Sequence, residues 1–308
     1  MSFKTVNIYT NGKYRNITVY SDDELFLHRQ IYNDSKFIFE SHTHERVYSY
    51  IQGKSNLTAV KDAHSVVKNY KYYVKCDIQG YFSNLQRNII SSTFDKIFGQ
   101  VFSRKILDRV FHCYSGISEG SPLSPAVSNV ALYDFDVKCD NFQNTHYFRF
   151  CDDMLFLTNT EPHRLLEKIE SYLSKYKLEL NKSKTQIGLT KNGFDFLGFT
   201  INPDKITVTK EKVHNIVQKL SDEKNIIKRN QIVNGWWAYC KDENYLPESP
   251  ESIILLGYTQ RYKLMRYIYA NNINFSSDEK KIVNNHFLKT FNIFGLVLTL
   301  FAIRRKKC

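Results

Sequence analysis

Residues 147–157 read Tyr-Phe-Arg-Phe-Cys-Asp-Asp-Met-Leu-Phe-Leu and place two adjacent aspartates, Asp152 and Asp153, between two apolar runs. This pattern predicts a strand, a tight turn and a second strand, with both carboxylates at the tip. Carboxylates held together at a partly buried edge repel one another unless a cation neutralises them. The stretch therefore predicts a metal site, provided that another part of the chain supplies further ligands.

A second apolar run upstream ends in an aspartate of its own. Residues 72–82 read Tyr-Tyr-Val-Lys-Cys-Asp-Ile-Gln-Gly-Tyr-Phe, with Asp77 at the end of the run. If the two runs lie side by side in an antiparallel sheet, Asp77 meets Asp152 and Asp153 at one edge. Oxygen ligands of this kind suit Mg²⁺, and two such ions can clamp the attacking and leaving oxygens of a phosphoryl transfer.

A turn rich in glycine, serine and proline lies between the two aspartate runs. Residues 114–132 contain Gly-Ile-Ser-Glu-Gly-Ser-Pro and then an apolar stretch, which Ser124 and Pro125 can begin as a helix. The three segments in this order, with 152 − 77 = 75 residues between the lead aspartates, resemble the palm of a reverse transcriptase. The similarity is to the prokaryotic branch, which includes group II intron, retron and compact defence-associated enzymes.

Four further segments extend this resemblance over roughly residues 10 to 240. Residues 178–185 are similar to the family's Leu-Asn-x-x-Lys-Thr segment, and residues 49–55 to a fingers segment. Residues 232–239 are similar to its Gly-Trp-x-x-Tyr thumb helix. Residues 194–199 resemble the Phe-Leu-Gly-Phe hairpin that holds the primer end, which implies a primer grip at Phe196, Leu197 and Gly198.

The resemblance implies an α+β fold shaped as a right-hand polymerase, with an antiparallel sheet packed on helices and a helical thumb. We expect fingers over residues 1–70 with part of 83–112, a palm over 71–205, and a thumb with a basic C-terminal tail over 206–308. An Asn-Gly pair near residue 11 predicts a hairpin in the fingers. With 308 residues for fingers, palm and thumb, we expect no RNase H or endonuclease domain in this sequence.

Composition agrees with a packed protein that binds a polyanion. The hydrophobic share is 42%, and the formal net charge is +12. Such a surplus favours a polyanionic partner, but charge alone does not name it, because a membrane-surface or ribosome-associated protein would look similar. The six cysteines form no Cys-x-x-Cys pair and follow no secretory signal. We therefore expect a cytoplasmic protein with neither a zinc site nor a disulfide framework.

The family's chemistry assigns roles around the aspartates. A primer 3′-hydroxyl attacks the α-phosphorus of an incoming nucleotide, and pyrophosphate leaves. The resemblance implies that Asp77 and Asp152 hold two Mg²⁺ ions, that Ile78 offers its backbone carbonyl and that Asp153 supports the site. Lys184 matches the family lysine placed near the pyrophosphate, as a proton donor. The expected partners are an RNA template, the DNA product and deoxynucleotides.

Three segments are expected to select the incoming nucleotide: the aromatic residue after Asp77, the turn around Glu119 and the N-terminal hairpin. Phe82 stands where the family places a ring under the sugar, which leaves no room for a 2′-hydroxyl. Glu119 and Gly120 lie in the turn that the family uses at the nascent base pair. Arg15 and Lys13 are candidates for gripping the triphosphate from the fingers.

Three residues depart from the family pattern. Phe150 replaces the usual Tyr, Ser118 the usual Pro and Glu119 the usual Gln. A carboxylate cannot donate the hydrogen bond that an amide donates, and it adds negative charge. We hypothesise that these departures restrict what the enzyme copies or incorporates. The options are one dedicated RNA template, a restricted nucleotide set or partly template-independent synthesis.

The subfamily that the chain resembles is inferred by elimination. Residues 61–64 and 208–210 match the retron motifs only in part, and Ser124 with Pro125 departs from the diversity-generating enzymes. We expect a stand-alone enzyme of an antiviral defence system with a dedicated non-coding RNA. The alternatives are a retron or group II intron-type reverse transcriptase, an RNA-directed RNA polymerase, which Phe82 disfavours, or a non-catalytic nucleic-acid-binding scaffold.

The C-terminal stretch carries a different pattern. Residues 290–303 contain no charge and precede a basic tail. Fourteen residues are too few for a comfortable bilayer span, so no stable membrane span is expected. A buried thumb helix is the main interpretation; a protein partner, a homo-oligomer contact or a membrane-surface contact are the alternatives.

Overall fold

The computed structural model describes residues 3–10, 13–111, 116–240, 243–259, 276–278 and 281. The chain divides into two compact units, residues 1–197 and 198–308. The sequence placed the palm–thumb boundary a few residues later, after residue 205. That boundary stays a prediction. Residues 202–205 form the turn of a short hairpin within the second unit, closed by the hydrogen bond from Asn202 N to Lys205 O at 2.9 Å.

The first unit is organised around a four-stranded antiparallel sheet with the strand order β4-β5-β3-β6. The strands are β3 (Tyr72–Asp77), β4 (Thr145–Phe150), β5 (Asp153–Thr158) and β6 (Gln186–Leu189). The predicted antiparallel pairing of the two aspartate runs is therefore confirmed. Alternate residues of β5 are buried on both faces, Met154 and Phe156 on one and Leu155 and Leu157 on the other.

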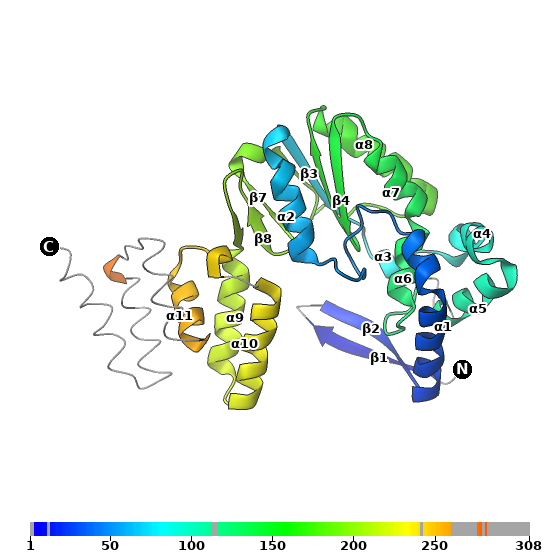
Figure 1. The fold of residues 1–308 in the computed structure, drawn as a ribbon, viewed down its shortest axis with the longest axis horizontal. Coiled ribbons are helices and arrows are strands. Elements are labelled where there is room, and N and C mark those ends of the chain that lie inside the picture. Colours follow the sequence, from blue (N-terminus) through cyan, green and yellow to red (C-terminus); the bar gives the residue numbers. More distant parts are fainter. Residues whose placement is uncertain are drawn as a thin grey trace. The chain divides into compact units, whose positions relative to one another are not determined.

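Helices cover this sheet and form the main core of the unit. Leu165, Ile169 and Leu173 of α8 pack with Val74 of β3 and Phe135 of α7 in one apolar cluster. On Figure 1, α7 and α8 lie on one side of the strands and α2 on the other. The helices of this unit are α1 (Asp22–Ser41), α2 (Asn56–Val66), α3 (Tyr81–Asn84), α4 (Arg87–Phe98), α5 (Gln100–Val110), α6 (Ser124–Ala131), α7 (Tyr133–Asp140) and α8 (Pro162–Leu173).

Local sequence signals explain where several of these helices begin. Ser21 accepts a hydrogen bond from Glu24 N ahead of α1, and Ser55 forms a capping box with Thr58 at α2. Pro125 lies in the first turn of α6, as expected from its fixed φ, although the side chain of Ser124 bonds to Ser118 O instead of capping the helix.

The N-terminus forms the predicted hairpin. Strands β1 (Phe3–Thr10) and β2 (Lys13–Tyr20) pair antiparallel, with Tyr9 opposite Tyr14 near the turn. The Asn-Gly pair at its tip lies outside the described residues. The hairpin is joined to the rest of the unit by the hydrogen bond from Thr18 N to Glu119 O at 2.7 Å.

The second unit contains a hairpin and a helical array. Strands β8 (Phe199–Ile201) and β9 (Ile206–Val208) precede α9 (Lys210–Asp222), α10 (Ile226–Cys240) and α11 (Pro250–Thr259). The Gly-Trp-x-x-Tyr segment is helical, as predicted, and lies in α10. Within the part of the chain that the structure describes, no helix combines the length and apolar character needed to cross a bilayer. The apolar stretch 290–303 and the basic tail lie outside it.

Candidate active site

The three predicted aspartates come together at one end of the central sheet. Strand β3 ends at Asp77 and β5 begins at Asp153, and these two residues are direct partners across the strands. Asp152 lies in the turn between β4 and β5, and its carbonyl accepts the N–H of Ile78 at 3.0 Å. The backbone therefore fixes all three carboxylates at the same edge.

This edge holds more negative charge than it can neutralise by itself. Burial raises the pKa of Asp153 to about 6, and the charges of Asp152 and Asp77 add to that rise. Burial also raises the pKa of Asp152, again with a contribution from Asp77. Both shifts show that ionising these carboxyl groups is unfavourable here unless a cation compensates them.

Lys184 supplies one positive charge. Its ammonium lies 2.6 Å from the carboxylate of Asp77, and this hydrogen bond raises the pKa of the lysine. The loop that carries Lys184 is tied to the same strand, because Asn181 N donates to Asp77 O at 2.8 Å. The sequence placed Lys184 near a leaving pyrophosphate; the structure places it on an aspartate of the site.

The donor chemistry of this edge fits a divalent cation. Three carboxylates face one lysine, and oxygen is the ligand type that Mg²⁺ prefers. Across the described residues, no three His, Cys, Asp or Glu side chains are gathered tightly enough to hold a metal ion as they stand. The carboxylate of Asp77 instead accepts a hydrogen bond from Lys184 Nζ at 2.6 Å.

The loop before α6 packs against the segment that follows Asp77. Ile117 N donates to Phe82 O at 2.7 Å, and a Cβ on Gly116 would lie 2.2 Å from the same carbonyl. The backbone of Phe82 is therefore held by this loop, while its ring is half-buried beside the core. The structure thus places Phe82 five residues beyond Asp77 with part of its ring accessible.

The structure also brings Arg15, Glu119 and Gly120 together. The guanidinium of Arg15 lies 3.7 Å from the carboxylate of Glu119. Gly120 has φ of +116°, and a Cβ there would lie 2.2 Å from Thr18 O, so only glycine fits this approach. The sequence proposed Arg15 for a triphosphate, whereas here it faces a carboxylate. The side chain of Lys13 lies outside the described residues.

The primer-grip candidates can be described only locally. Phe196 is buried in β7 (Phe194–Phe196), at the end of the first unit. Leu197 and Gly198 follow with positive φ values of 51° and 80°. They form the tight turn expected of such a hairpin.

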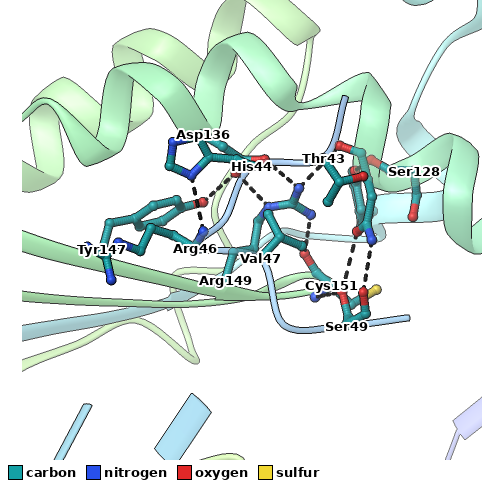
Figure 2. A network of polar contacts seen from close by, with 12 residues as sticks. Thr43, His44, Arg46, Val47, Ser49, Ser128, Asp136, Tyr147, Arg149 and Cys151 are labelled. Atoms are coloured by element: carbon teal, nitrogen blue, oxygen red, sulfur yellow. Dashed lines mark hydrogen bonds and ion pairs between the residues drawn. The ribbon is translucent and has the colours of Figure 1, made fainter. Parts of the chain in front are cut away.

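Sequence reasoning did not single out the residues that support the turn between β4 and β5. Arg149 is fully buried and bonded to Asp136, and its Nη1 donates to Cys151 O at 3.2 Å (Figure 2). The signal that could have found it was an arginine inside an apolar strand, because a buried charge requires a partner.

Two serines of the loop around Glu119 bond to the N-terminal segment. The sequence marked Ser118 only as a departure from the family pattern and did not single out Ser121. The hydroxyl of Ser118, at the position where the family has proline, lies 2.6 Å from Tyr20 Oη. Ser121 Oγ lies 3.0 Å from His28 Nδ1. Both bonds tie the loop to the N-terminal segment, so the departure at Ser118 has a structural reason.

Comparison with known proteins is consistent with this geometry. Residues 4–201 match the family model described as reverse transcriptase (RNA-dependent DNA polymerase). The retron Ec83 reverse transcriptase of Escherichia coli is 22% identical over 193 residues, covering 56% of this chain and 60% of that protein. The chain thus spans less than two thirds of the length of this relative.

Solved structures of telomerase share the fold. Apo telomerase from Candida tropicalis aligns with a TM-score of 0.57 at 12% identity, covering 93% of this chain and 61% of that one. Telomerase from Candida albicans, solved with a fragment of telomeric RNA, aligns with a TM-score of 0.53 at 11% identity, covering 97% and 63%. At these identities the likeness concerns the fold alone.

Proposed function

The chain belongs to the reverse transcriptase (RNA-dependent DNA polymerase) family, and from this premise we propose that it copies RNA into DNA. The observation that carries the proposal is the placement of Asp77 directly opposite Asp153, with Asp152 at the adjoining turn. A non-catalytic scaffold would gain nothing from gathering three carboxylates when burial opposes the ionisation of two of them, Asp152 and Asp153.

In the proposed reaction, the primer 3′-oxygen forms a bond to the α-phosphorus of a deoxynucleotide, and the bond from that phosphorus to the β-phosphate oxygen breaks. The hydroxyl proton passes to solvent, and pyrophosphate leaves. Asp77 and Asp152, with the carbonyl of Ile78, would hold two Mg²⁺ ions, and Asp153 would support them. When bound, such ions stabilise the charge on the attacking and leaving oxygens.

Lys184 suits a second role in this reaction. Its raised pKa keeps the ammonium charged at neutral pH, so it carries a proton that the leaving pyrophosphate can accept. Its position on Asp77 keeps it beside the reacting groups. Phe82 would select the sugar by occupying the space of a 2′-hydroxyl.

Template and partners are part of the proposal. The net charge of +12 favours a polyanion, and we propose an RNA template in an antiviral defence system with its own non-coding RNA. The similarity to the retron Ec83 enzyme favours a retron-type reverse transcriptase as the second candidate. Sequencing the nucleic acid that copurifies with the protein tests the choice of template: a dedicated non-coding RNA predicts one dominant RNA species, and a mixture with no dominant RNA would contradict it.

Primer extension on poly(rA) with oligo(dT), dTTP and Mg²⁺ tests the activity. We expect extension by the wild type and a loss of at least about a thousand-fold in Asp152→Asn, because one ligand charge is removed at the reacting centre. Asp34→Asn, an equal charge change at an exposed position of α1, is the matched control and should be normal. Equal activity in Asp152→Asn and wild type would refute the assignment.

We propose that Glu119 restricts the templates and nucleotides that the enzyme accepts. Its carboxylate pairs with Arg15, so a triphosphate that uses this guanidinium must compete with it. Glu119→Gln removes the competing charge and restores an amide donor. We expect a lower KM for dTTP and a broader range of templates; unchanged product length and composition would remove the idea.

A further inference from the structure

The turn that carries the catalytic aspartates has an unusual backbone. Cys151, immediately before Asp152, has φ of 58°, a left-handed conformation that a non-glycine residue adopts only at a cost. Such a conformation persists where surrounding contacts determine it. The groups that hold Cys151 therefore also decide where the next two carboxylates point.

Two side chains, one from a distant segment and one from strand β4, hold Cys151 by both of its backbone groups. The hydroxyl of Ser49 accepts the N–H of Cys151 at 2.9 Å. The guanidinium of Arg149 donates from Nη1 to the carbonyl of Cys151 at 3.2 Å. Figure 2 shows Ser49 and Arg149 on either side of this turn.

Each of these side chains is fixed in turn by a buried partner. Arg149 donates to both carboxylate oxygens of Asp136, from Nε at 2.7 Å and from Nη2 at 2.6 Å, and both side chains are fully buried. Ser49 is held by Asn129, whose Nδ2 donates to Ser49 O at 2.9 Å. Arg149 Nη2 also donates to Asn129 O at 3.3 Å, which joins the two supports into one network.

We propose that Ser49, Arg149 and Asp136 are positioning residues that impose the conformation of Cys151 and so aim Asp152 and Asp153 toward Asp77. This rests on the proposed function, in which those carboxylates do the chemistry. A buried bidentate ion pair is geometrically specific, because the fork of the guanidinium meets both carboxylate oxygens in one orientation. The hydrogen bond from Cys151 N to Ser49 Oγ adds a second constraint, from a segment far upstream of the strands that carry the aspartates.

Ser49→Ala tests the network with a small change. It removes the acceptor for Cys151 N and leaves the ion pair in place. We expect kcat for dTTP incorporation on poly(rA) with oligo(dT) to fall about three- to ten-fold, while KM for dTTP stays within about two-fold. Thr158→Val is the matched control, since Thr158 is equally buried at the opposite end of β5 and its hydroxyl bonds to Asn144 O. It should lose stability but keep kcat.

A second measurement does not depend on DNA synthesis. Binding of Mn²⁺ to the protein without nucleic acid, followed by electron paramagnetic resonance, reports how the aspartates are held. We expect Ser49→Ala to bind Mn²⁺ at least about three-fold more weakly than wild type, and Thr158→Val to bind it normally. If the wild type makes no DNA but this difference is found, the proposed function fails and the positioning role stands.

The results that overturn the positioning role are equally definite. If Ser49→Ala matches Thr158→Val in both kcat and Mn²⁺ affinity, the network only stabilises the fold. Should Ser49→Ala fail to fold, Arg149→Lys replaces it, because lysine keeps the charge beside Asp136 but cannot reach both partners as the planar fork does. Failure of both variants to fold also overturns the proposal.

Discussion

Replacing Asp136 by asparagine would leave the guanidinium of Arg149 buried without a countercharge. Both side chains are fully buried, and the arginine donates to both oxygens of the aspartate at 2.6–2.7 Å. Asparagine retains one acceptor oxygen, but its amide NH₂ group would face an N–H donor of the Arg149 guanidinium. Breaking a buried pair in this way costs about 3–5 kcal/mol, because an uncompensated charge remains.

Hydrogen exchange followed by mass spectrometry can measure this loss locally. A cost of about 3–5 kcal/mol corresponds to amide hydrogen exchange through local opening that is faster by a factor of about 10² to nearly 10⁴. We expect this acceleration in peptides covering β4 and β5. Both tryptophans of the chain, Trp236 and Trp237, lie in the second unit, so their fluorescence does not report directly on β4 and β5.

A double variant provides the control. Arg149→Met with Asp136→Leu removes both charges together, and we expect it to be more stable than Asp136→Asn because no buried charge is left unpaired. Acceleration of less than ten-fold in Asp136→Asn, or a double variant less stable than the single one, would contradict the reasoning.

Three further predictions concern separate parts of the first unit. Phe82→Ala should admit ribonucleotides, seen as a fall of at least about ten-fold in the ratio of kcat/KM for dTTP over UTP; an unchanged ratio would contradict the role of the ring. Gly120→Ala should cost about 1–3 kcal/mol, since its Cβ would lie 2.2 Å from Thr18 O, and faster hydrogen exchange in β2 would report it. Burial lowers the pKa of His146 below its ordinary value of 6.5, so the folded state takes up its proton less readily than the unfolded chain. The contribution of neutral His146 to the free energy of unfolding should therefore be fully present above pH 6.5 and decline as the pH falls below it. Urea titrations at pH 7.5 and 5.5 measure this decline, and it should be smaller in His146→Phe.

The central sheet was predictable because its signal is local. Apolar runs that end in Asp77 and begin at Asp153 specify two buried strands, and the carboxylates mark the ends at which those strands must meet. The helical thumb segment around Trp236 was predictable for a similar reason, since its pattern lies within one helix.

The contacts between segments were not predictable in this way. The pairing of Lys184 with Asp77 spans 107 residues, and the bond between Tyr20 and Ser118 spans 98. These pairs depend on how the loops and the N-terminal hairpin pack, which no short motif encodes. The contact between Arg15 and Glu119 shows the consequence, because two residues predicted to face a nucleotide face each other.

The strand order has a consequence for synthesis on the ribosome. In the order β4-β5-β3-β6, the strand made first, β3, is flanked on both sides by strands made later. Its neighbour β5 ends at Thr158, which is 158 − 77 = 81 residues after Asp77. At about 5–20 residues per second, this apolar strand waits roughly 4–16 s for its first partner. The nascent chain therefore passes through a period in which a chaperone that shields extended apolar segments would raise its yield.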